Sequence, residues 1–99
     1  MDIAISVNKV PIRFTYERWY HITENHDDLA SYFHEILDLI ENPEIICCGN
    51  NSSFKATKIF GKKKWLVVVY KEISKNDGVV ITAYFLSTKP KGEVIWKRH

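Results

Sequence analysis

The sequence predicts an α+β domain with two N-terminal helices packed on one face of a curved antiparallel sheet of four to five strands. Apolar residues recur at helical spacing before residue 42 and in strand-like runs after residue 44. Short polar turns separate the later runs, and such turns usually join neighbouring strands. The chain of 99 residues is enough for one two-layer core, so we expect one domain over residues 1–99.

The N-terminal segments predict weak strands followed by a helix. Residues 3–7 and 10–14 alternate only weakly between apolar and polar, and Pro11 favours an edge or lead-in strand. Thr15 is a suitable N-cap because its hydroxyl can accept a hydrogen bond from a free N–H of the first turn. We therefore expect a helix over residues 16–25.

A second helix has the clearest pattern in the chain. Asp27 or Asp28 is a suitable cap, and Pro43 ends the helix because proline disfavours the helical conformation of the residue before it. Five apolar residues at i, i+4, i+7, i+8 and i+11 form its buried face: Leu29, Phe33, Ile36, Leu37 and Ile40.

The last five apolar segments predict the strands of an antiparallel meander. In the segment GVVITAYFL, strict alternation should give one face to the helices and the other, which carries hydroxyl groups, to the opposite side. The helix-facing set is then Val79, Ile81, Ala83 and Phe85, and the opposite set is Val80, Thr82 and Tyr84. The five expected strands are residues 44–48, 54–60, 64–73, 78–86 and 93–97.

Charge is distributed unevenly along the chain. Residues 1–53 contain three basic and nine acidic side chains, a net charge of −6, whereas residues 54–99 contain eleven basic and three acidic side chains, a net charge of +8. The basic half would give the sheet a face suited to polyanions, although lysine is also common on exposed strands and turns.

Composition argues against several classes of protein. No apolar run reaches the ~18–20 residues that span a bilayer, and the N-terminus lacks the basic and apolar regions of a signal peptide. The adjacent Cys47 and Cys48 should point to opposite faces of a strand, which rules out a useful disulfide framework. We expect a soluble cytoplasmic protein with reduced thiols and no membrane partner.

Residues 18–26, RWYHITENH, concentrate groups that suit phosphodiester chemistry. Arg18 and His21 share one side of the expected helix, and His26 lies at its end, so the three side chains can converge. Histidine exchanges protons near neutral pH, and arginine binds phosphate bidentately. Cleavage of RNA by its own 2′-OH needs a base, an acid and positive donors, and it needs no metal. Neither the histidines nor the cysteine pair have metal-ligand spacing, so we expect no metal and no cofactor.

Motifs along most of the chain resemble those of one nuclease family. The order ERWYHI, a second histidine, WLVVVYK and ITAY is similar to that in phage and bacterial members of the barnase–EndoU–colicin–RelE (BECR) superfamily. The resemblance implies a BECR/RelE-like α+β fold with two helices on an antiparallel sheet. It also implies a metal-independent endoribonuclease, often a toxin or a domain of one.

Carried over by position, the resemblance implies a site of five residues. His21 and His26 are the acid–base candidates, Arg18 binds phosphate, and Thr82 and Tyr84 position it. Because Thr82 and Tyr84 should face away from the helices, they can meet His21 only under two conditions. Either the first helix curls past the sheet edge, or the assignment of strand faces is inverted.

Lys89 and Lys91 follow the last long strand and are expected to hold the RNA backbone, with a solvated loop as the alternative. The expected partner is RNA, and a toxin would add a cognate antitoxin or immunity protein, or the ribosome. The competing hypothesis is a catalytically inactive module that binds nucleic acid or protein on the same scaffold. Both hypotheses need the basic half of the chain, but only the enzyme needs the histidines.

Overall fold

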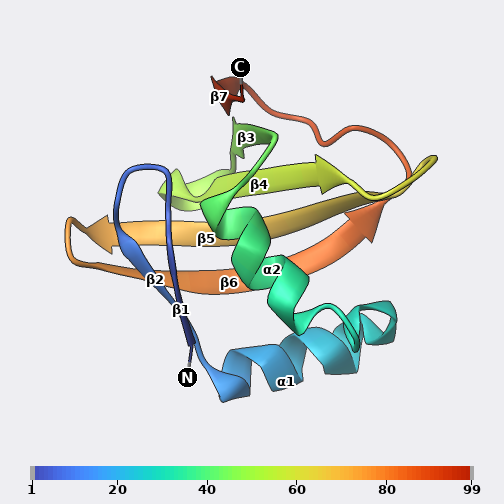
Figure 1. Ribbon diagram of the computed structural model, residues 1–99, viewed down its shortest axis with the longest axis horizontal. Helices are drawn as coiled ribbons and strands as arrows, with labels where there is room; N and C mark the ends of the chain where they lie inside the picture. The colour runs from blue at the N-terminus through green and yellow to red at the C-terminus, as the bar shows by residue number, and fades with distance from the viewer. Residues whose placement is uncertain (1, 99) are drawn as a thin grey trace.

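A computed structural model describes residues 2–98 and shows one mixed sheet with helices across its face and along its edge (Figure 1). The two α-helices are α1 (Tyr16–Asn25) and α2 (Phe33–Glu41), and the two short 3₁₀ turns are η1 (Asp27–Leu29) and η2 (Asn50–Ser52). The strands are β1 (Asp2–Ile5), β2 (Pro11–Phe14), β3 (Ile45–Cys48), β4 (Phe54–Ile59), β5 (Trp65–Ser74), β6 (Asp77–Leu86) and β7 (Val94–Lys97).

The predicted arrangement of two N-terminal helices on a four-to-five-stranded antiparallel sheet is wrong. The sheet has seven strands in the order β1-β2-β6-β5-β4-β3-β7, and the β1–β2 hairpin precedes both helices. β2 runs parallel to β6, which makes the sheet mixed. Ile12 and Phe14 explain why β2 joins the sheet, because both side chains are fully buried in the core.

β7 is also placed differently from the predicted meander. It pairs antiparallel with β3 at the far edge of the sheet instead of lying beside β6. The connection over residues 87–93 is long enough to cross the end of the sheet, as the orange and red trace of Figure 1 shows. Trp96 packs against the core from this edge, which gives β7 an apolar anchor there.

The first helix has the predicted bounds, and the second does not. The Thr15 hydroxyl accepts a hydrogen bond from the backbone N–H of Arg18 at 3.1 Å, which confirms the N-cap of α1. The predicted second helix is divided into η1 and α2. Leu29 N–H donates to His26 C=O and Tyr32 N–H donates to Leu29 C=O, so tight three-residue turns replace the α-helical pattern here. Neither helix of the described chain is long and apolar enough to cross a membrane.

An aromatic cluster joins the β1–β2 hairpin to the helices. Phe14 of β2 stacks on Phe33 of α2 with ring centroids 5.1 Å apart, and it meets Trp19 of α1 edge-on at 5.9 Å. Ile22, also buried, continues this contact along α1. These contacts fix α1 along the β6 edge of the sheet (Figure 1).

Candidate functional site

The ITAY motif places its two hydroxyl groups on the face of β6 that points away from α2. Ala83 is fully buried, and Phe85 packs edge-on against Tyr32 with ring centroids 5.0 Å apart. Because side chains alternate along a strand, Thr82 and Tyr84 lie on the opposite face. The predicted strand faces of Thr82, Ala83, Tyr84 and Phe85 are confirmed.

A β-bulge at Ile81 reverses the side of the sheet to which the residues before Thr82 in β6 point. Val69 of β5 pairs with Thr82, but Tyr70 pairs with Val80, so Ile81 is the extra residue. Val80 is consequently buried in the core, and Ile81 lies on the opposite side. The prediction for Val79, Val80 and Ile81 is wrong, since Val79 pairs with Lys71 on the face away from the helices, and strict alternation in a sequence carries no sign of a bulge.

A groove of about 720 Å³ lies on the face of the sheet that carries Thr82 and Tyr84. Three lysines line it: Lys55 on β4, Lys71 on β5 and Lys91 in the loop before β7. Among the described residues that line the groove, none is acidic. We call this feature the lysine groove. Unpaired cations gathered in a concave surface raise the local concentration of polyanions.

Cross-strand register explains how the lysine groove is assembled. Lys55 pairs with Val69, and Val69 pairs with Thr82, so the three residues form one row across β4, β5 and β6. Lys71 lies two residues beyond Val69 on the same face of β5. Sequence analysis missed Lys55 and Lys71 because their proximity to Thr82 depends on strand order and register. The one available signal is that each occupies the solvent-facing position next to a buried strand residue.

The C-terminal end of α1 reaches the edge of this groove. β2 pairs with β6 only near the start of β6, and α1 runs beside the remainder of that edge (Figure 1). His26 is the C-cap of α1, and its backbone N–H donates to Ile22 C=O at 2.8 Å. Its partly buried imidazole lies 6.2 Å from the Tyr84 ring, centroid to centroid. The C-cap of α1 therefore brings His26, and not His21, next to Tyr84.

The other predicted site residues are placed outside the groove. Arg18 and His21 are exposed on α1. His21 lies within α1, whereas the backbone of His26 leaves the helical conformation at the C-cap, with φ −138° and ψ 75°. Lys89 is exposed, and of the two predicted lysines only Lys91 lines the groove. The structure thus brings together Thr82, Tyr84, Lys91 and His26, and leaves out Arg18, His21 and Lys89.

The environment of Tyr84 favours its protonated form. Partial burial raises the pKa of the Tyr84 phenol above its ordinary value, because the phenolate loses hydration there. The hydroxyl is therefore a hydrogen-bond donor throughout the neutral range. Together with the Thr82 hydroxyl and the lysines, it gives the groove donors suited to phosphate oxygens.

Two tight loops contribute residues to the lining of the groove. In the first, the Ser53 hydroxyl donates to Asn50 C=O at 2.6 Å and Gly49 N–H donates to Ser53 C=O at 2.9 Å. Asn51 has a φ of 54°, the left-handed conformation that asparagine tolerates well. In the second, Lys91 C=O accepts a hydrogen bond from the Lys55 amino group, which ties the loop to β4.

Gly92→Ala is expected to lower the free energy of unfolding by about 1–3 kcal/mol. Gly92 has a φ of +121°, and an added Cβ would lie 2.7 Å from Cys48 C=O. Urea denaturation measures the loss. Gly61→Ala is the matched control, because Gly61 has a φ of +143° but no atom within 4 Å of the added Cβ. Equal losses in the two variants would contradict the close packing of this loop on β3.

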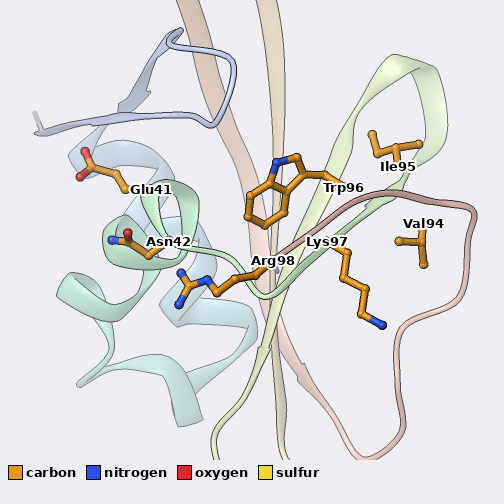
Figure 2. Close-up of a pocket in the computed structure, with 7 residues that line it drawn as sticks. All are labelled: Glu41, Asn42, Val94, Ile95, Trp96, Lys97 and Arg98. Atoms are coloured by element: carbon orange, nitrogen blue, oxygen red, sulfur yellow. The ribbon is translucent and has the colours of Figure 1, made fainter.

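A second depression of about 640 Å³ lies between the end of α2 and β7. Figure 2 shows Arg98, the residue after β7, reaching toward Asn42, whereas Lys97 points away from it. The carboxylate of Glu41, at the rim, accepts a hydrogen bond from the backbone N–H of Ile5 at 2.8 Å. Among its described lining residues there is no imidazole or hydroxyl group, so the lysine groove is the better candidate for chemistry.

The groups of the lysine groove determine what it can do. No set of three or more His, Cys, Asp and Glu side chains within residues 2–98 is placed to hold a metal ion. Lysine and hydroxyl donors bind phosphate oxygens, and the imidazole at the edge can transfer a proton. Comparisons with protein-family models, with curated proteins and with solved structures found no match to this chain.

Proposed function

We propose that this protein is a small metal-independent endoribonuclease that binds the RNA backbone in the lysine groove. The observation that carries this proposal is that three lysines, Thr82 and Tyr84 line one groove, with the His26 ring next to Tyr84. The groove has the charge that a polyanion needs, and His26 and Tyr84 supply groups that can exchange protons with it. The resemblance of the ERWYHI and ITAY motifs to BECR nucleases supports the same activity.

In the proposed reaction His26 removes the proton from a ribose 2′-OH. The 2′-oxygen then attacks the adjacent phosphorus, and the bond from phosphorus to the 5′-oxygen breaks. The Tyr84 hydroxyl, which is protonated at neutral pH, donates its proton to the departing 5′-oxygen. The products are a 2′,3′-cyclic phosphate and a 5′-hydroxyl end.

The lysines stabilise the charge that develops during this reaction. Attack by the 2′-oxygen gives the phosphorane more negative charge than the starting diester. Lys55 and Lys71 line the same groove as Thr82, and the Thr82 hydroxyl adds a neutral hydrogen-bond donor. Fixed donors of this kind favour the transition state over the bound substrate.

A binding module without catalytic activity is the second candidate. It is favoured by the positions of Arg18 and His21, which lie exposed on α1 and outside the groove. Only His26 then brings an imidazole to the groove edge within the described chain. This candidate predicts RNA binding without cleavage, and the enzyme predicts both.

Lys71→Ser is expected to weaken RNA binding and to reduce the slope of log K against log salt by about 0.7, the value for one lost phosphate contact on a single strand. Fluorescence anisotropy with a labelled 2′-O-methyl RNA measures both quantities, since this ligand lacks the attacking hydroxyl. Lys75→Ser is the matched control, because Lys75 carries the same charge on the exposed β5–β6 turn. Identical slopes for the two variants would argue against RNA binding in the lysine groove.

A further inference from the structure

The hairpin between β4 and β5 gathers cations around an exposed aromatic ring. Phe60 N–H donates to Lys64 C=O at 2.8 Å, which closes the turn GKKK at residues 61–64. We call the surface formed by this turn and its neighbours the basic hairpin patch. Its members are Tyr32, Lys58, Phe60, Lys62, Lys63 and Lys64.

Contacts with Tyr32 and Lys64 position the aromatic rings of the basic hairpin patch. The Lys64 amino group donates to the Tyr32 hydroxyl at 3.1 Å and lies 4.6 Å from the centroid of the Phe85 ring. Tyr32 in turn meets Phe60 edge-on, with ring centroids 6.1 Å apart. Phe60 remains 36% exposed, so part of a fixed ring is available to a partner.

Within the described structure, no acidic side chain forms an ion pair with the lysines of the patch. Arg13 and Asp77 form the only ion pair among residues 2–98, and neither belongs to the patch. Four lysines on one hairpin repel one another, and a polyanion would relieve that repulsion. Cations beside an exposed aromatic ring are the arrangement by which proteins bind single strands without reading sequence, since the ring stacks on a base.

The basic hairpin patch lies at the end of the sheet next to Tyr84. Tyr84 pairs with Val67 of β5, and Lys64 precedes Val67 by three residues. At about 3.3 Å per residue, the turn begins about 10 Å beyond Tyr84 along the strand. Because Lys64 and Tyr32 contact Phe85 on the α2 face, a strand bound in the lysine groove would pass Tyr84 and turn around the end of the sheet to reach Phe60.

We propose that the basic hairpin patch is a second binding subsite, for the single-stranded RNA that leaves the lysine groove. The lysines of the turn contact its phosphates, and Phe60 stacks on one of its bases. The route of the strand rests on the proposed function. The ligand class does not, because binding at this subsite requires no cleavage.

Phe60→Leu is expected to weaken binding of a labelled 2′-O-methyl uridine dodecamer about 5-fold or more, because leucine cannot stack on a base. Phe60→Tyr keeps the ring and is expected to bind as the wild type does. Lys62→Ser should lower the salt slope by about 0.7, whereas Lys75→Ser at the other end of the hairpin strands should not. Unchanged melting temperatures would show that the variants are folded.

The outcomes separate this proposal from the proposed function. Equal affinity of Phe60→Leu and wild type, or no binding by wild type, would overturn the subsite. So would a Phe60-dependent interaction with phosphatidylglycerol vesicles together with no effect of Phe60→Leu on the dodecamer. Phe60-dependent binding by a protein that does not cut RNA would contradict the ribonuclease and support the subsite.

Discussion

His26→Ala is expected to lower the single-turnover rate of RNA cleavage about 100-fold or more, because general acid–base catalysis contributes roughly 10²–10⁴-fold. RNA affinity should change little, since the lysines that bind the backbone remain. The imidazole is only partly buried at the end of α1, so its removal leaves the core intact. Quenched cleavage of a labelled RNA, with enzyme in excess, measures the rate.

His21→Ala is the matched control for this prediction. The motif resemblance assigns His21 to the acid–base pair, but the structure exposes it on α1 and outside the lysine groove. A His21→Ala variant that keeps its activity would support catalysis at the groove edge. A His21→Ala variant as inactive as His26→Ala would move the chemistry to α1. Full activity of His26→Ala would contradict the proposed reaction.

Phe14→Ala is expected to lower the free energy of unfolding by about 3–5 kcal/mol, the usual loss for a buried phenylalanine. Phe14 is fully buried and contacts Phe33 and Trp19, so it joins β2 to both α-helices. Its removal leaves a cavity at the junction of three elements. Chemical denaturation monitored by circular dichroism measures the change.

The control for Phe14→Ala is Tyr16→Ala, two residues further along. Tyr16 is 67% exposed in the first turn of α1, so its loss should cost less than about 0.5 kcal/mol. A Phe14→Ala variant that loses less than about 1 kcal/mol would mean that β2 is not packed into the core. That result would contradict the seven-stranded mixed sheet.

Local signals in the sequence predict α1 well and the sheet poorly. The N-cap and bounds of α1 depend on residues within one turn, and Thr15 supplies the capping group directly. The place of β2 depends on its parallel pairing with β6, more than sixty residues away along the chain. β7 is similar, because its partner β3 becomes apparent only when the connection over residues 87–93 crosses the sheet. Neither pairing can be recognised from the residues near it in the sequence.

The candidate site was predictable to the extent that it follows strand alternation. Thr82 and Tyr84 lie on the predicted face because the strand is regular from Thr82 to Phe85. The convergence of His21 with His26 was not supported, since the chain turns out of the helix at His26. The residues around Lys71 in the sequence do not predict that it lines the groove, because its position there depends on the register of β5 against β6.

The most direct test of the ribonuclease is cleavage of a mixed RNA pool by the purified wild-type protein in excess EDTA, with chemical analysis of the new ends. We predict EDTA-resistant cutting that leaves 2′,3′-cyclic phosphates and 5′-hydroxyl ends, and that is lost in His26→Ala. No cutting by a folded wild-type protein would contradict the proposal, as would cutting abolished by EDTA or ends that carry a 5′-phosphate.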